Sequence, residues 1–174
     1  VIWGNKSSIL VGDYLLSRCF EMIVEDGSHE VLKLLSSTSS IIAQGEVSQL
    51  EYKGEIDMLE EIYFKIINSK TASLFAAATR IGACITNKNR KEKDALESYG
   101  RNLGLAFQIV DDALDYYSSK KIFGKEIGKD FFEGKVTLPI IFVYQEANLE
   151  ERSFLGKIFK KKNRTNYEFD QIQT

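Results

Sequence analysis

Apolar residues recur at intervals of three and four along almost the whole chain, which is the spacing of an amphipathic helix. The first apolar stripe covers residues 9–23 and stops at a turn over residues 25–28. Ser28 is suited to cap a second helix, whose apolar positions cover residues 31–50 before Gly54 interrupts them. No sustained alternation of apolar and polar residues is found, so the pattern predicts an all-α protein.

The second half of the pattern predicts three more helical regions. Helical spacing extends over residues 59–85, with either continuation or a kink at residues 70–71, and a long helix covers residues 90–117. Residues 118–136 are rich in glycine and lysine and are expected to form a loop. Pro139 then suits the first position of another helix. Because neither a linker nor a repeat interrupts this pattern, residues 1–174 are interpreted as one domain.

Composition narrows the class of protein. A net charge of −2 excludes a nucleic-acid binder that acts through bulk positive charge. Two cysteines, Cys19 and Cys84, cannot build a disulfide framework, which favours a reducing, cytoplasmic location. The longest apolar stretch, residues 74–85, is too short to cross a membrane and contains Arg80, so no transmembrane segment is expected.

The long helix carries an unusual polar stripe. At 100° per residue, six side chains share roughly a third of its circumference: Gly100, Gly104, Gln108, Asp111, Asp112 and Asp115. Aspartate is a poor helix former, and like charges at these spacings repel each other. Such a stripe therefore indicates a cation site, and oxygen ligands on a rigid helix suit Mg²⁺ bound largely through phosphate and water. An exposed acidic helix face is the alternative, although Asp-Asp-x-x-Asp after Phe-Gln is a rare coincidence.

A second candidate segment lies downstream, where Lys125, Lys129 and Lys135 alternate with glycines. Lysines in a glycine-rich loop are typical of phosphate binding. Taken by itself, the segment could equally be a solvent-exposed loop without a ligand. The segment is not a Walker A loop, because the glycine spacing is one residue too long and Val136 follows Lys135 where Ser or Thr is required. Beside the acidic stripe, the lysines favour a diphosphate clamp.

These segments resemble motifs of the trans-isoprenyl diphosphate synthases, the polyprenyl synthetase family, and its long-chain bacterial members in particular. Residues 107–115 resemble the second aspartate-rich motif, residues 70–75 the Lys-Thr motif, and residues 124–139 the Gly-Lys loop. Residues 4–16 resemble the helix that follows the first aspartate-rich motif, and residues 45–46 a further family dipeptide. The resemblance covers nearly the whole chain and implies an isoprenoid-synthase-type helical bundle.

The resemblance also implies a reaction. An allylic prenyl diphosphate ionises, and isopentenyl diphosphate attacks the carbocation, which lengthens a polyprenyl diphosphate. Asp111 would ligate Mg²⁺ directly, while Asp112, Asp115 and Asp130 would hold its waters. Lys70, Lys125 and Lys135 would neutralise the departing diphosphate. The Thr71 hydroxyl, the Lys70 carbonyl and the Gln108 amide oxygen would direct negative dipoles at the cation. Family members form dimers, and the apolar faces over residues 9–23 and 31–50 would suit a homodimer.

The sequence departs from the family pattern in one respect: it holds one aspartate-rich motif where the family uses two. We therefore expect the C-terminal part of a synthase, without the N-terminal helices that carry the first motif, and no synthase turnover by this chain alone. Three alternatives remain open at this stage: a non-catalytic or relic subunit that pairs with an active synthase, a terpene cyclase, and an acidic helical interaction module.

Overall fold

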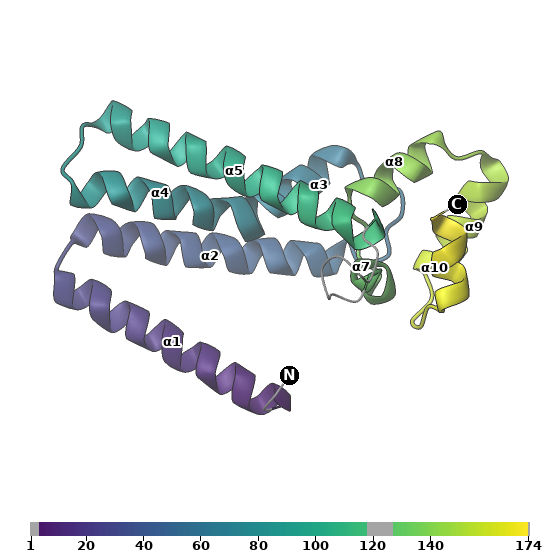
Figure 1. The fold of residues 1–174 in the computed structure, drawn as a ribbon, viewed down its shortest axis with the longest axis horizontal. Coiled ribbons are helices and arrows are strands. Elements are labelled where there is room, and N and C mark those ends of the chain that lie inside the picture. Colours follow the sequence, from purple (N-terminus) through teal and green to yellow (C-terminus); the bar gives the residue numbers. More distant parts are fainter. Residues whose placement is uncertain (1–3, 118–126, 174) are drawn as a thin grey trace.

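The first two predicted helices are present, although α1 begins five residues before the first apolar position of its stripe. The computed structural model describes residues 4–117 and 127–173, and they form helices joined by turns, with no strand among them (Figure 1). The chain opens with α1 (Gly4–Asp26) and α2 (His29–Glu51). The Val31 N–H donates to the Ser28 hydroxyl at 3.3 Å, which confirms Ser28 as the cap of α2.

The middle of the chain contains a π-helical turn that includes residues 70–71, where the sequence pattern predicts either a continuous helix or a kink. Helix α3 (Glu60–Ile67) passes through the π turn η1 (Asn68–Ala72) into α4 (Ser73–Ile85) without a break. Within η1 the Ser73 N–H donates to the Asn68 carbonyl, five residues back. Such a turn inserts an extra residue into a helix, so it changes which way the following side chains point. The long helix α5 (Arg90–Tyr117) follows as predicted.

Residues 127–173 form four short helices: α7 (Lys129–Glu133), α8 (Leu138–Glu146), α9 (Leu149–Phe159) and α10 (Asn166–Ile172). The expected loop over residues 118–136 is therefore wrong in its second half. Gly128 is the N-cap of α7 and Gly134 its C-cap, with φ of +79° and +76°. Glycine adopts this left-handed conformation easily, and a residue in it cannot continue an α-helix, so the two glycines set the limits of α7. Pro139 occupies the second position of α8 rather than the first, since Thr137 is the N-cap.

Helices α2, α4 and α5 lie side by side, whereas α1 diverges from α2 beyond the turn that joins them (Figure 1). Two glycines of α5 allow α4 and the end of η1 to approach closely. A Cβ atom at Gly100 would lie 2.4 Å from the Phe75 carbonyl oxygen, and one at Gly104 would lie 2.6 Å from the Ala72 Cα. The glycine half of the predicted stripe therefore serves contact between helices.

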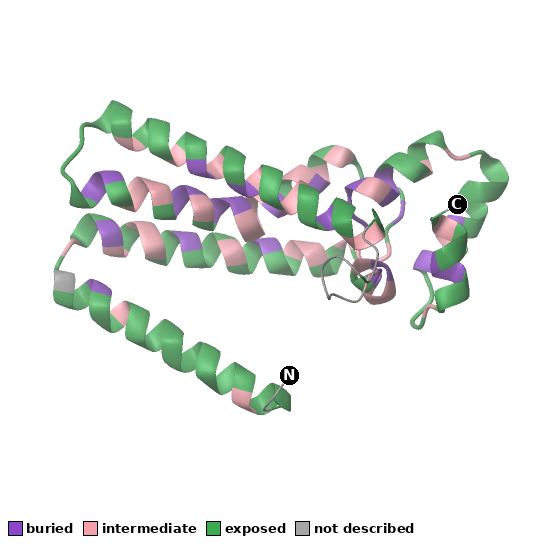
Figure 2. Ribbon diagram, in the orientation of Figure 1, coloured by how far each residue is buried: buried purple, intermediate pink, exposed green. Residues whose placement is uncertain are grey.

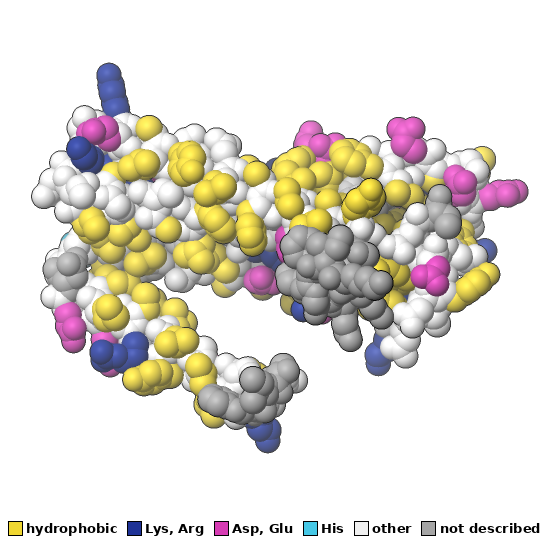
Figure 3. Space-filling model, in the orientation of Figure 1, with side chains coloured by type: hydrophobic (Ala, Val, Ile, Leu, Met, Phe, Trp, Pro, Cys, Tyr) yellow, Lys and Arg dark blue, Asp and Glu magenta, His cyan; other side chains and the backbone are white. Residues whose placement is uncertain are grey.

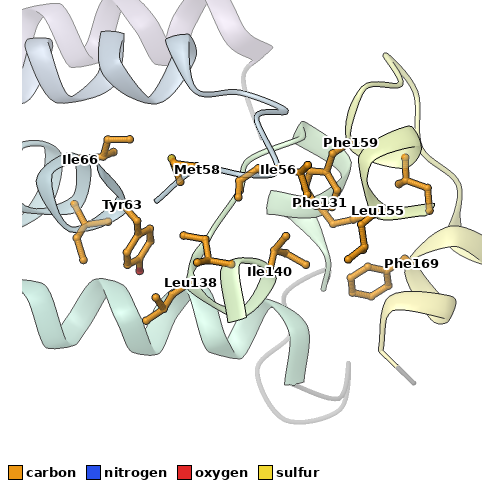
Figure 4. Packing of buried hydrophobic residues seen from close by; sticks show 14 residues of the cluster. Ile56, Met58, Tyr63, Ile66, Phe131, Leu138, Ile140, Leu155, Phe159 and Phe169 are labelled. Carbon is orange, nitrogen blue, oxygen red and sulfur yellow. The ribbon is translucent and has the colours of Figure 1, made fainter. Parts of the chain in front are cut away.

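The main core lies at the end of this bundle, where the short helices meet α3 and α5. Large side chains from separate helices pack there, with Phe131, Ile140 and Ile141 at most 1% exposed (Figure 4). Phe131 contacts the rings of both Phe159 and Phe169, at centroid distances of 5.8 and 5.4 Å. This core fixes α7 and α10 beside the last turns of α5, which is where the predicted carboxylates lie.

Other apolar side chains remain exposed. Helix α1 is exposed along nearly its whole length (Figure 2), and hydrophobic side chains gather on it and along α5 (Figure 3). The exposed members of α5 that adjoin the acidic stripe are Leu103, Phe107, Val110 and Leu114. No helix in the described part of the chain is long and apolar enough to cross a membrane.

Candidate functional site

A cavity of about 1280 Å³ lies at the end of α5, between η1, α7 and α10. Six carboxylates line it: Asp111, Asp112, Asp115, Asp130, Glu133 and Asp170. Three described lysines line it as well: Lys70, Lys129 and Lys135. The structure thus brings the predicted acidic stripe, the Lys-Thr segment and part of the lysine segment to one cavity. Lys125 lies outside the described residues.

Asp112 is the most buried of these carboxylates and is held by protein donors. It is 3% exposed, and its two oxygens accept hydrogen bonds from different helices. The Tyr63 hydroxyl of α3 donates to Asp112 Oδ2 at 2.7 Å, and Gln108 Nε2 donates to Asp112 Oδ1 at 2.8 Å. Because a carboxylate oxygen has two lone pairs, each oxygen can still accept a hydrogen bond from water. The geometry is compatible with Asp112 holding a metal-bound water.

The Gln108 amide joins this carboxylate to the π turn. Gln108 Oε1 accepts the Thr71 hydroxyl at 2.7 Å, so both ends of the amide have partners. Thr71 uses its single proton in that bond and can offer only lone pairs elsewhere. Oxygen dipoles without a competing proton are what a carbocation site needs, as the resemblance implied for Thr71.

Burial dominates the titration of Asp112. It raises the pKa of the carboxyl from 3.8 to about 6, although the hydrogen bonds from Tyr63 and Gln108 act in the opposite direction. Burial also raises the pKa of the Tyr63 phenol, and the neighbouring Asp112 charge raises it further. Tyr63 is therefore protonated near neutral pH and can donate to Asp112.

The raised pKa of Asp112 predicts that acid stabilises this part of the fold when no metal is present. Between about pH 4 and 6 the folded protein keeps a proton on Asp112 that the unfolded chain has released, so stability falls as pH rises through this range. Lowering the pH from about 7 to 4.5 should add about 2 kcal/mol to the unfolding free energy relative to Asp112→Asn. Guanidinium unfolding of both proteins at the two pH values, in a chelator, measures this difference. An identical difference at both values would contradict the assignment.

Asp115 holds the start of α7 against α5. Its Oδ2 accepts the Asp130 N–H at 2.8 Å and its Oδ1 the Lys129 N–H at 3.2 Å, while its own carbonyl accepts the Gly128 N–H. Burial raises the pKa of Asp115, and the bond from the Asp130 N–H lowers it in part. These bonds bring Asp130 to the cavity. Asp115 therefore has a structural task that the sequence did not indicate.

Lys70 extends from η1 toward α2. Its Nζ donates to Gln49 Oε1 at 2.9 Å and lies 3.9 Å from Glu46 Oε1. The backbone of η1 can approach α2 at this point because Gly45 has no side chain. A Cβ atom at Gly45 would lie 2.6 Å from the backbone nitrogen of Lys70. The Gly45-Glu46 dipeptide thus has a physical reason: the glycine admits the π turn and the glutamate approaches its lysine.

Lys135 follows the end of α7 and is paired with acidic neighbours. Its Nζ lies 2.6 Å from Glu133 Oε2 and 3.2 Å from Asp130 Oδ1. Burial lowers the pKa of Lys135, but these two carboxylates outweigh it and the net shift is upward. Lys135 is thus a held cation rather than part of a flexible loop. A phosphate group would compete with Glu133 and Asp130 for it.

Sequence reasoning missed Tyr63 and Glu133. Tyr63 lies among apolar neighbours on α3 and reads as a core residue, which it also is at 2% exposure. Nothing near it in the sequence points to Asp112, which lies 49 residues away. Glu133 immediately precedes Gly134 in the segment interpreted as a loop. Only the short helix α7 shows that it contacts Lys135.

The donor set fits a metal held mainly by its substrate. Among the described residues, no three His, Cys, Asp or Glu side chains are grouped so that they could hold a metal ion. Mg²⁺ keeps several waters and is usually bound through one or two carboxylates together with substrate phosphates. Asp111 is exposed and lines the cavity, and Asp130 faces the same space from α7. The site therefore suits Mg²⁺ bound with a diphosphate and does not form a closed protein cage.

Comparison with known proteins identifies the family of the chain. The polyprenyl synthetase family model matches residues 1–174. Octaprenyl diphosphate synthase of Escherichia coli is 38% identical over 92% of this chain and 50% of its own length. All-trans-nonaprenyl-diphosphate synthase of Rhodobacter capsulatus is 40% identical over 89% of this chain and 47% of its own. The chain thus spans about half the length of these curated relatives.

Solved structures agree with the sequence comparison. A polyprenyl synthase from Caulobacter crescentus, complexed with calcium and isoprenyl diphosphate, is 41% identical to this chain, and the two structures have a TM-score of 0.93. The match covers 99% of this chain and 52% of the Caulobacter chain. A decaprenyl diphosphate synthase from Rhodobacter capsulatus is 40% identical, with a TM-score of 0.88 over 99% of this chain and 53% of its own. The helical fold and these matches agree, and the chain belongs to the polyprenyl synthetase family.

Proposed function

We propose that this chain supplies the diphosphate-binding half of a Mg²⁺-dependent polyprenyl diphosphate synthase. In the reaction, an allylic prenyl diphosphate loses diphosphate and isopentenyl diphosphate attacks the resulting carbocation. Loss of a proton from the adduct restores a double bond, and repeated condensations yield a long-chain polyprenyl diphosphate. The observation that carries the proposal is the convergence of Asp111, Asp130, Lys70 and Lys135 on one cavity from α5, α7 and η1. Membership of the family supports the reaction type.

The charged residues would bind the leaving diphosphate. Asp111 and Asp130 would hold Mg²⁺ and its waters, and Asp112 would orient one of those waters while it remains bonded to Tyr63. Lys70 and Lys135 would contact the diphosphate oxygens, exchanging their present carboxylate and amide partners for phosphate. When bound, the metal would supply positive charge that stabilises the departing diphosphate. Lys125 remains a further candidate for this role.

The apolar stripe of α5 would accommodate the prenyl chain. Leu103, Phe107, Val110 and Leu114 adjoin the carboxylates, and the Phe107 ring packs 5.5 Å from the Phe75 ring of α4. A carbocation formed at the acidic end would then lie next to apolar walls, where less water is available to quench it. The Thr71 and Gln108 oxygens lie at the junction of the two regions and would stabilise the cation.

Exposed apolar side chains support a homodimer as the assembly. On α1, Leu10, Tyr14 and Leu15 are each more than 60% exposed, and Val47 and Leu50 of α2 are more than half exposed. Exposed apolar surface of this kind marks interaction sites in soluble proteins. Sedimentation of the chain across a range of concentrations tests this assembly.

Binding and turnover are tested separately. We expect the purified chain to bind inorganic diphosphate in calorimetry when Mg²⁺ is present and to lose this binding in a chelator. With labelled isopentenyl diphosphate, an allylic starter and Mg²⁺, we expect no elongation, because the 174 residues hold one aspartate-rich motif. Failure to bind Mg²⁺-diphosphate would contradict the proposed site, and clear elongation would contradict the proposed lack of turnover.

A further inference from the structure

Tyr63 is a core residue whose hydroxyl reaches the candidate site. The side chain is 2% exposed, packs edge-on against Phe64 at 5.5 Å, and points from α3 toward α5 (Figure 4). Its hydroxyl donates to Asp112 Oδ2 at 2.7 Å, across 49 residues of sequence. A buried hydroxyl bonded to a buried carboxylate is a strong, charge-assisted contact. It connects the hydrophobic core directly to the aspartate-rich motif.

The hydrogen bond from Tyr63 affects both oxygens of the Asp112 carboxylate. With Oδ2 bound to Tyr63, Asp112 presents Oδ1 to the amide nitrogen of Gln108 at 2.8 Å. The amide must then turn its oxygen the other way, toward the Thr71 hydroxyl at 2.7 Å. Thr71 thereby spends its proton on Gln108. One series of hydrogen bonds therefore runs from the Tyr63 hydroxyl of α3 through Asp112 and Gln108 of α5 to Thr71 of η1.

We propose that Tyr63 is a positioning residue of this site. By fixing the Asp112 carboxylate, it holds the Gln108 amide and the Thr71 hydroxyl with their oxygen lone pairs directed for use by the bound substrate. Without the phenol hydroxyl, the Asp112 carboxylate can rotate about its Cβ–Cγ bond, and the Gln108 amide and Thr71 hydroxyl bonded in series to it lose their fixed positions. The proposal rests on the proposed function for the nature of the substrate, but the ordering of Gln108 can be measured without any ligand.

Tyr63→Phe removes the hydroxyl and keeps the ring. Tyr116→Phe is the matched control, because Tyr116 is a partly buried tyrosine near the same end of α5 that does not line the cavity, and the hydrogen bonds of Asp112 and Gln108 go to other residues. In NMR spectra, the side-chain NH₂ signals of Gln108 are identified by their loss in Gln108→Glu. We expect Tyr63→Phe to shift these signals and speed their exchange with solvent about tenfold, the usual effect of losing one hydrogen bond. Tyr116→Phe should leave them unchanged.

A second measurement separates positioning from simple stabilisation. At a temperature where every variant is folded, we expect Tyr63→Phe to weaken Mg²⁺-dependent binding of inorganic diphosphate about tenfold, as is usual when a residue supporting a metal ligand is lost. Tyr116→Phe should bind like the parent chain. If Tyr63→Phe does not fold, Asp112→Asn should disturb the same Gln108 signals through the other partner of the bond.

The outcomes distinguish this proposal from the one on which it rests. Unchanged Gln108 signals in folded Tyr63→Phe, or unchanged signals in Asp112→Asn where Tyr63→Phe is unfolded, would overturn the positioning role. Shifted signals together with a parent-like diphosphate affinity would also overturn it, because Tyr63 would then support only the fold. If the parent chain binds no Mg²⁺-diphosphate, the proposed function fails, and the Gln108 signals still decide whether Tyr63 orders the amide.

Discussion

Substitution of Gly100 by alanine should lower the unfolding free energy by about 3 kcal/mol. A Cβ atom at this position would lie 2.2 Å from Thr79 Oγ1 and 2.4 Å from the Phe75 carbonyl oxygen. The threonine hydroxyl can rotate away, but the carbonyl belongs to the backbone of α4, so α4 and α5 must separate. This loss exceeds the gain of about 1 kcal/mol that alanine normally brings to a helix. Urea unfolding followed by circular dichroism measures the difference.

Gly82→Ala is the matched control for this substitution. Gly82 lies on α4, in the same helix pair, but no atom lies within 4 Å of the position that its Cβ atom would occupy. Here alanine should stabilise the protein by about 0.5–1 kcal/mol through helix propensity alone. If Gly100→Ala were as stable as Gly82→Ala, α4 and α5 could not pack as closely as the structure shows.

The packing of α5 illustrates which features of the fold can be predicted from the sequence. Helix positions followed from apolar periodicity, and Ser28 marked the start of α2, because both signals lie within a few neighbouring residues. The stripe geometry placed Gly100 and Gly104 on one face of α5 and indicated close approach of a helix or a ligand. It could not identify α4 as the neighbour, since nothing local encodes which helix packs against which.

The candidate site shows the same division between local and distant information. The acidic stripe and the lysines were visible as motifs, and the structure brings Asp111 and Lys70 to one cavity. Their present partners were not predictable, because Tyr63 and Asp112, or Lys70 and Gln49, meet only after α2, α3 and α5 have packed. Asp115 is instructive: its spacing resembled that of a metal-site residue, yet its oxygens accept the first N–H groups of α7. Asp115 therefore supports the site by holding α7, which forms one wall of the cavity.

The exposed apolar faces and the acidic cavity lie on the same helix, which constrains how the site can function. The α5 stripe from Leu103 to Leu114 is about as long as three helical turns. Left in water, such a stripe favours association, and covering it would also dry the cavity mouth. A surface that covers the stripe would thus strengthen the electrostatic contacts at Asp111 and Lys70, because charges interact more strongly away from water. Binding of diphosphate and coverage of the stripe should therefore reinforce each other.

Substitution of Asp111 by asparagine should weaken Mg²⁺-dependent diphosphate binding about 100-fold. Asp111 is exposed to the cavity, and the described residues offer no three-ligand metal cluster that could compensate for its loss. Removing one anionic ligand from an ion held by one or two carboxylates leaves little of the protein's contribution. The unfolding free energy should change by less than about 0.5 kcal/mol, as is usual for an exposed side chain.

Asp94→Asn provides the control, because it removes the same charge from the same helix far from the cavity. Asp94 pairs with Arg80 at 2.7 Å, and an exposed ion pair contributes at most about 1 kcal/mol to stability. Its diphosphate affinity should equal that of the parent chain, measured by calorimetry at one fixed ionic strength. Equal weakening by both substitutions would mean that the overall charge, rather than a ligand at Asp111, controls binding. Weakening by Asp111→Asn alone would assign the metal contact to that carboxylate.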